Sequence, residues 1–248
     1  EYEKAADEIG KAIDIYAKLE DTTALVSSYN LLGLIYIGKK DYKNVIDCFQ
    51  RSLDLANKSK DYAGLTNSYR SYGEYYCEIL DFQRAIESFK QSLALSIQLG
   101  NKRQESDLLT KIGHAYSMIG RFDEELKYGL RALDIRQKAG IKYLVASSMI
   151  NVGYSYYTLR KYDSAIDYTS KALEIAKDVG HLFFQRNAYK VFIAIYEATG
   201  DYPKALEAYR EFDRIKDTMS LLEKDRQLIG MRNHYETIVT DRKIRDLK

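Results

Sequence analysis

One stretch of the chain carries most of the residues of a phosphate-binding loop. Residues 33–40 read Gly-Leu-Ile-Tyr-Ile-Gly-Lys-Lys. In such a loop the backbone amides surround the phosphates, the lysine contacts them, and a following Ser or Thr binds Mg²⁺, with a strand before the loop. Lys40 stands where the hydroxyl is required, and the flanking residues have helical spacing. Nucleotide binding is therefore not predicted.

The other candidates for chemistry are three histidines and a pair of carboxylates. His114, His181 and His234 lack the short, paired spacing of zinc ligands. Glu124 and Glu125 are adjacent, and adjacent side chains of a helix point about 100° apart, so they do not form a catalytic pair. We predict no metal, no cofactor and no enzymatic activity, unless a domain outside this sequence supplies it. His114 falls on a face where ligand contact stays open.

Composition narrows the function further. The net charge of +2 gives no reason to expect a nucleic acid as partner. No apolar run reaches the roughly 18 residues of a membrane span. Cys48 and Cys77 are predicted to be small, partly buried side chains. A single proline among 248 residues favours long, uninterrupted helices.

Four residue columns recur along the chain at one shared period of forty positions. The first is a glycine, at Gly33, Gly73, Gly113 and Gly153. The second is a tyrosine three positions later, at Tyr36, Tyr76, Tyr116, Tyr156 and Tyr196. The third is aromatic and the fourth mostly small, at Tyr42, Phe82, Phe122, Tyr162, Tyr202 and at Val45, Ala85, Glu125, Ala165, Ala205. A shared period in four columns predicts a helical-repeat solenoid.

Each period is expected to hold two helices, for example residues 24–37 and 42–58, joined by a turn at residues 38–41. Aspartate before the second helix is a good N-cap, because its carboxylate accepts hydrogen bonds from free amides of the first turn. The predicted caps are Asp41, Asp81 and Asp201.

The columns resemble the tetratricopeptide repeat. The matching residues are Leu32, Gly33, Tyr36, Val45, Phe49 and Ser52, and then Tyr72, Gly73, Tyr76, Ala85, Phe89 and Ser92. The resemblance implies an all-α, right-handed α-α superhelix over residues 1–215, with a partial repeat at 1–20 and five helix pairs after it. Residues 1–20 align with a second helix only, so the first helix of that repeat is expected upstream.

The sequence departs from the family pattern in two ways. Its repeat is longer than the family's usual length of about 34 residues. In the third unit Glu125 occupies the small-residue column, and Gly129 stands where Phe49 and Phe89 stand in the earlier units. A glycine inside a helix costs about 1 kcal/mol relative to alanine, so the third unit is expected to pack loosely.

The first helix of each unit is expected to line the inner face of the solenoid, where a ligand binds. Counting from the glycine column nominates a set of mostly polar side chains: Asn30, Asn67, Arg70, Glu74, Asp107, Lys111, His114, Ser147, Asn151, Tyr154, Asn187 and Lys190. Asparagine amides both donate to and accept from a peptide backbone. The set therefore predicts a protein or an extended peptide as ligand.

Residues 216–248 leave the period and form a charged helical segment. Leu228, Met231, Tyr235 and Ile238 have the 3-4-3 spacing of a short coiled-coil seam. Two interpretations stay open. The segment is either a helix that caps the solenoid, or a signalling helix that pairs weakly with a second copy.

The segment 227–237 resembles a stretch of bacterial signalling proteins in which a tetratricopeptide array runs into a charged helix bearing Tyr-Glu-Thr, here Tyr235 to Thr237. In those proteins a membrane span and histidine kinase, or a helix-turn-helix regulator, follows. The resemblance implies a sensory input module, either cytoplasmic or in a membrane-anchored periplasmic sensor. The alternative is a free-standing scaffold that assembles other proteins.

Overall fold

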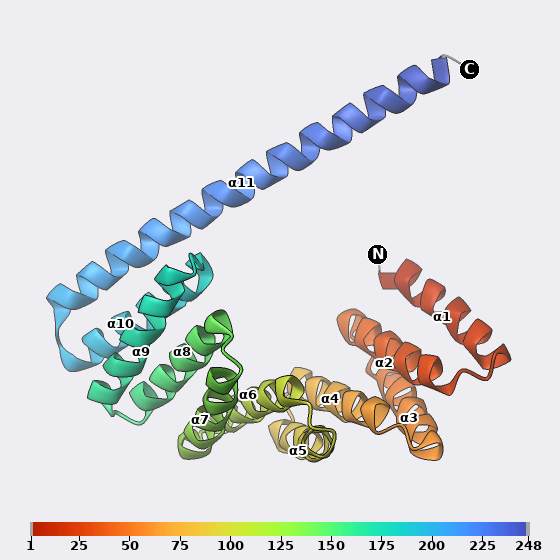
Figure 1. Cartoon of the computed structure of the whole chain (residues 1–248), viewed down its shortest axis with the longest axis horizontal. Coiled ribbons are helices and arrows are strands. Elements are labelled where there is room, and N and C mark those ends of the chain that lie inside the picture. Colours follow the sequence, from red (N-terminus) through yellow and green to blue (C-terminus); the bar gives the residue numbers. More distant parts are fainter. Residues whose placement is uncertain (1, 247–248) are drawn as a thin grey trace. The chain divides into compact units, whose positions relative to one another are not determined.

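The computed structural model describes the chain from Tyr2 to Asp246, with side chains placed for residues 2–233 and 235–237. The described residues form eleven α-helices and contain no strand (Figure 1). The helices are α1 (Tyr2–Lys18), α2 (Thr22–Lys39), α3 (Tyr42–Ser59), α4 (Tyr62–Glu78), α5 (Phe82–Gln98), α6 (Lys102–Met118), α7 (Phe122–Lys138), α8 (Lys142–Thr158), α9 (Tyr162–Asp178), α10 (Leu182–Thr199) and α11 (Tyr202–Asp246).

Successive helices pack in pairs, as the repeat predicts. Two compact units are present, one with α1–α7 and the other with α8–α11. In the first unit α1 packs on α2, and the pairs are α2–α3, α4–α5 and α6–α7. In the second unit the pairs are α8–α9 and α10–α11. The fold is the all-α helical-pair architecture expected from the four columns.

The helices are joined by junctions that recur at a constant spacing along the chain. Each junction contains one residue in the left-handed region, at Glu20, Lys40, Lys60, Leu80, Gly100, Gly120, Gly140, Arg160, Gly180 and Gly200. This conformation lets the last helical carbonyls accept bonds from the turn, so the helix ends sharply. Two junctions fall in every repeat, and they divide it into two halves of equal length.

At six of these junctions the residue after the left-handed position caps the next helix with its side chain, whereas Arg121, Lys161 and His181 make no such hydrogen bond. The predicted caps are confirmed: the carboxylates of Asp41, Asp81 and Asp201 accept from the backbone amides three residues on. Asp21, Asp61 and Asn101 do the same. Such a cap typically contributes about 1 kcal/mol.

Leu80 adopts the left-handed conformation at one of these junctions, which is unfavourable for a residue with a Cβ. Its φ is 61°, and its side chain is 71% exposed, so no packing offsets the strain. Gly120 holds the same place one repeat later, with φ 75°. Leu80→Gly is expected to raise the free energy of unfolding by about 0.5–1 kcal/mol, because glycine adopts this region without steric cost. The reciprocal variant, Gly120→Leu, is expected to lower it. Urea titration measures both, and a loss of stability in Leu80→Gly would contradict the argument.

The glycine column allows close contact between the two helices of a pair. A Cβ placed at Gly33 or Gly73 would overlap the ring of Phe49 or Phe89 on the second helix of the same pair. Both rings are fully buried. At Gly113 the nearest atoms to a Cβ would be the Glu125 carbonyl oxygen at 3.3 Å and the Tyr128 Cβ at 3.6 Å, and neither belongs to a ring. The third pair is less tightly interlocked there, because Gly129 presents no ring.

The last helix continues beyond the solenoid. Ala205, Ala208, Phe212 and Ile215 of α11 pack on the α10 side. From Lys216 to Asn233 every side chain is exposed except that of Met219, which is half-buried. Ile215 is the last fully buried residue of α11, although the helix itself runs on to Asp246 (Figure 1). Nowhere in the described part of the chain does a helix combine the length and apolar character that crossing a bilayer requires.

Candidate ligand-binding surface

Two polar bridges join neighbouring first helices in the first unit. Gln104 Nε2 on α6 donates to Asn67 Oδ1 on α4 at 3.2 Å. Two turns further along, Lys111 Nζ on α6 lies 3.0 Å from Glu74 Oε1 on α4. We call the exposed side of α4 and α6 that carries these bridges the first-helix surface. Three of its residues, Asn67, Glu74 and Lys111, are among those predicted from the sequence.

Arg70 and Asp107 lie between the two bridges in the sequence of their helices. Asp107 Oδ1 accepts from the guanidinium of Arg136 on α7 at 2.8 Å. Arg136 is only 6% exposed, and its Nε also donates to Ser106 Oγ at 3.4 Å. Arg70 Nε is buried and has no hydrogen-bond partner among the described atoms. The Arg70 side chain is thus half-buried, and its Nε is not accessible from the surface.

His114 completes this surface as an exposed side chain one turn beyond Lys111. In the part of the chain that the structure describes, no three or more His, Cys, Asp or Glu side chains gather where they could hold a metal ion.

In the second unit the predicted residues lie on α8 and α10. Asn151, Tyr154 and Lys190 are exposed, and Ser147 and Asn187 are half-buried. The Tyr154 ring lies 5.9 Å from that of Tyr157, measured between centroids. This surface is more aromatic than that of the first unit, and its polar side chains are free to reach a ligand.

Asn30 does not belong to the candidate surface, and its assignment needs correction. It is 6% exposed, and its amide nitrogen donates to Ser68 Oγ on α4 at 3.0 Å. Ser68 Oγ in turn lies 2.8 Å from Ser52 Oγ on α3. Asn30 is thus part of a buried polar contact among α2, α3 and α4, because the next first helix covers it.

Sequence reasoning missed Gln104 and Arg136. Gln104 carries no signal in the columns, since it lies outside the counted offsets. Arg136 does carry a signal in the sequence. The equivalent positions of other repeats hold small residues, Ala56, Ser96 and Ala176, all fully buried. A long cation in a column of small buried residues indicates a side chain that must find a partner across the helix.

Burial dominates the electrostatics of the cysteines and the core tyrosines. Desolvation raises the pKa of the Cys48 thiol to about 11 and also raises that of Cys77. The pKa of Tyr72 rises to about 12 for the same reason. Both thiols are neutral at physiological pH, and neither is activated as a nucleophile.

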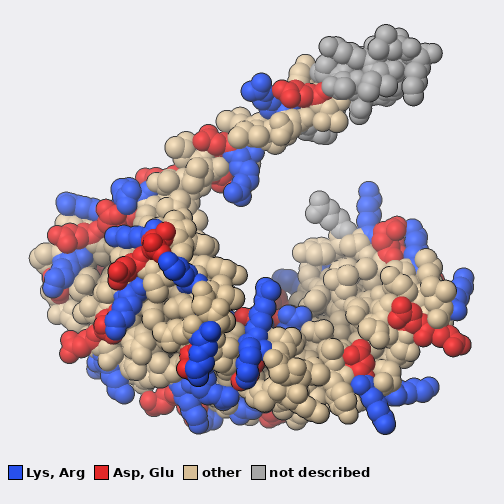
Figure 2. Space-filling model, viewed as in Figure 1, with Lys and Arg blue, Asp and Glu red and all other residues tan. Residues whose placement is uncertain are grey.

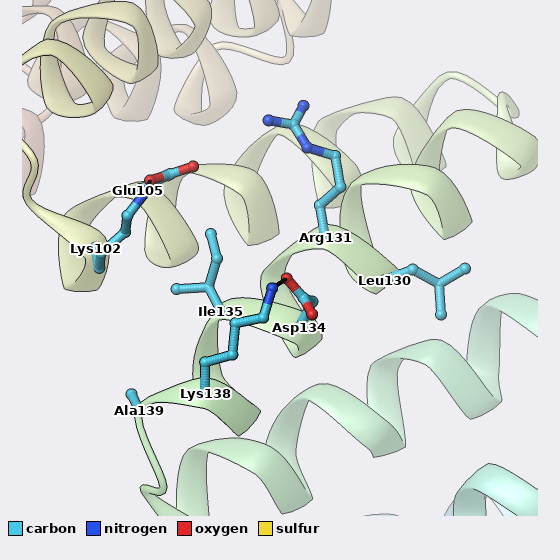
Figure 3. A pocket seen from close by; sticks show the side chains of 8 residues that line it. All are labelled: Lys102, Glu105, Leu130, Arg131, Asp134, Ile135, Lys138 and Ala139. Carbon is cyan, nitrogen blue, oxygen red and sulfur yellow. Dashed lines mark hydrogen bonds and ion pairs between the residues drawn. The ribbon is translucent and has the colours of Figure 1, made fainter.

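A pocket of about 670 Å³ lies between the start of α6 and the end of α7. Figure 3 shows Lys102 and Glu105 on α6, Leu130, Arg131, Asp134, Ile135 and Lys138 on α7, and Ala139 directly after α7. The charged side chains that line the pocket form ion pairs with one another: Lys102 contacts Glu105 at 2.8 Å, and Lys138 contacts Asp134 at 2.7 Å. The sequence did not predict this pocket.

Over the face drawn in Figure 2, basic and acidic side chains are interspersed within each unit.

The profile of the Tetratricopeptide repeat family matches residues 23–98, 64–138 and 104–178 in overlapping segments. These segments span more than half of the chain, and the helix pairs and glycine column are those of that repeat. The chain belongs to the tetratricopeptide repeat family. A comparison with curated proteins gives no match.

Solved structures with the same fold come from several kinds of protein. BtubC (BKLC) from P. vanneervenii has a TM-score of 0.79 and 19% identity, over 88% of this chain and 92% of that one. The apo form of RapI has a TM-score of 0.72 and 17% identity, over 81% and 73%. PH0952 from Pyrococcus horikoshii, a signal transduction ATPase with a tetratricopeptide repeat sensor, has a TM-score of 0.62 and 20% identity, over 85% and 36%. At these identities the likeness shows the fold.

Proposed function

We propose that the chain binds a protein or peptide on the first-helix surface, and that the corresponding residues of α8 and α10 form a separate candidate surface on the second unit. The observation that carries this proposal is the bridged polar row on α4 and α6. Asn67, Glu74 and Lys111 are held in place by Gln104 and by each other, while remaining at least partly exposed. Side chains held in this way lose less rotational freedom when a ligand binds.

The chemistry of this row favours an extended peptide. Asn67 offers an exposed amide that pairs with a peptide backbone. Acidic and basic side chains alternate, with Glu74 beside Lys111. A ligand that carries both acidic and basic side chains and has free backbone N–H and C=O groups would pair with the charged and amide groups of this surface.

We further propose that the module is the input region of a bacterial signalling protein. PH0952 is named as a signal transduction protein with a tetratricopeptide repeat sensor, and this chain spans about a third of it, 36%. The exposed part of α11 supports the proposal, since a long helix leaving the repeats suits transmission to a further domain, and its exposed seam suits pairing with a second copy. Ile238, the fourth predicted seam residue, has its side chain outside the described residues. A scaffold function remains the second candidate, favoured by the repeats alone.

The surface is tested by a double substitution with a matched control. Asn67→Ala with Glu74→Ala is expected to weaken the binding of a peptide selected by display against the whole chain by about 1–3 kcal/mol, or roughly 5- to 150-fold in Kd, because an amide contact and a charged contact are lost. The control, Gln91→Ala with Ser170→Ala, removes exposed polar groups from second helices and is expected to leave Kd unchanged. Calorimetry measures Kd, and circular dichroism checks the helix content. Equal weakening by both pairs would refute the assignment of the surface.

A further inference from the structure

The base of α11 presents large apolar side chains that have no counterpart packed on them. Tyr202, Leu206 and Tyr209 are 70%, 52% and 42% exposed. The residues equivalent to Tyr202 and Tyr209 in the first full repeat are Tyr42 and Phe49. Those two rings are covered by the following first helix, at centroid distances of 5.9 Å to Tyr75 and 5.2 Å to Tyr72. The face that takes a further helix in the array is therefore open on α11.

The same face of α11 continues into the exposed seam. At 100° per residue, Met231 lies within about 20° of Tyr202 around the helix axis, and Leu228 lies within about 40° of Leu206. Leu228, Met231 and Tyr235 are all more than half exposed. Ala208 and Ile215, which are buried toward α10, lie on a different side. One helix face thus carries two exposed apolar groups, separated by a charged stretch that includes Asp217 and Lys224.

We propose that this face binds the same face of a second copy in antiparallel orientation, centred between Ser220 and Leu221. Residues at equal distances from that centre then lie opposite each other. Leu206 meets Tyr235 of the partner subunit, and Asp217 meets the partner's Lys224. Tyr209 lies beside the partner's Met231. The contact is isologous, so each of these pairs occurs twice in the dimer.

Two observations favour the antiparallel orientation over a parallel coiled coil. A parallel pair in register places Lys224 against the partner's Lys224 and Asp217 against the partner's Asp217. The antiparallel pair covers both apolar groups and joins opposite charges. It also repeats the arrangement within the array, where α4 follows α3 after one tight turn and runs back along it. The exposed part of α11 from each copy would cover the face of the other copy's α11 that, elsewhere in the array, the first helix of the following repeat covers.

The paired faces extend from Leu206 to Tyr235, which is about 44 Å of helix at 1.5 Å per residue. Five large apolar side chains from each copy contribute, where the seam alone would contribute three. This inference rests on the proposed pairing of α11 with a second copy and is independent of the first-helix surface. A failure here would leave the peptide experiment unaffected.

Mixed cysteine variants determine the orientation. Leu206→Cys and Tyr235→Cys, prepared with tags of different size and mixed under mild oxidation, are expected to give mainly the mixed disulfide dimer. Tyr235→Cys alone is expected to give little. Cys48 and Cys77 are present in every sample, so the unaltered chain supplies the background. Efficient self-crosslinking of Tyr235→Cys without mixed product would show a parallel pair and overturn the proposal.

A charge reversal tests the contact without oxidation. Asp217→Lys turns two attractive pairs into repulsive ones and is expected to raise the dimer dissociation constant about tenfold or more, measured by sedimentation. Adding Lys224→Asp to that variant is expected to restore the dimer. Both residues are exposed, so circular dichroism should show unchanged helix content. A chain that stays monomeric at its highest soluble concentration, or a double variant no better than Asp217→Lys, would also overturn the proposal.

Discussion

Gly73→Leu is expected to lower the free energy of unfolding by about 3 kcal/mol, which is near the upper end for overpacked cores. The new side chain would enter the space of the Phe89 ring, which is 1% exposed and has no direction in which to move. Gly113→Leu is expected to cost less, about 1 kcal/mol, because Gly129 leaves the facing helix without a ring and overpacking there is milder. Thermal and urea unfolding of the whole chain measure both changes.

Gly10→Leu is the matched control for this prediction. Gly10 lies inside α1, and a Cβ built there meets nothing within 4 Å. Leucine is a better helix former than glycine, so this variant is expected to be as stable as the unaltered chain or slightly more stable. If Gly73→Leu were tolerated as well as Gly10→Leu, the glycine column would have no packing role.

Asp107→Ala is expected to lower the free energy of unfolding by about 1.5–3 kcal/mol, as a charged hydrogen bond does when it is lost. Arg136 is buried to 6% exposure, and Asp107 supplies the carboxylate at 2.8 Å that compensates its charge. A buried cation that loses its anion costs far more than a surface pair that is broken. Urea titration measures the change.

Two further variants check this explanation. Glu74→Ala breaks a more exposed ion pair, so it is expected to cost about 0–1 kcal/mol. The double variant Asp107→Ala with Arg136→Ala should recover much of the loss, because alanine already fills the equivalent position at Ala56 and Ala176. If the double variant were less stable than Asp107→Ala, the charge of Arg136 would not be the source of the cost.

The sequence predicted the helices well because their columns record packing. The contact between Gly33 and Phe49 could be predicted from the sequence, because a glycine and an aromatic residue recur at the same spacing in the next repeat. The ends of the helices were less predictable. The turn expected at residues 38–41 is shorter, because Lys40 takes the left-handed conformation and α2 continues to Lys39. Lys40 is not a residue that propensity places in that region.

Helix periodicity predicts which side of its own helix a residue lies on, and the candidate surface could be predicted from the sequence only to that extent. Counting from a glycine places Asn67 and Asn151 on an exposed side, but it cannot tell that α4 covers Asn30. Contacts that depend on long side chains from another helix, such as the one from Arg136 to Asp107, require the packed structure. A helix after residue 215 was predicted from the sequence, but its unbroken join to the last helix of the repeats was visible only in the structure.

The equal halves of the repeat have a consequence for how such an array changes in evolution. Because a left-handed residue and the position that caps the next helix recur in every half-repeat, a gene duplication or deletion of one whole repeat would reproduce each junction and keep the alternation of first and second helices. A recombination event that removed half a repeat would also preserve every turn. It would nevertheless set a second helix where a first helix belongs, so that a ring such as Phe49 would no longer find its glycine. One whole repeat is the smallest step by which this gene segment can lengthen or shorten and still encode a packed array.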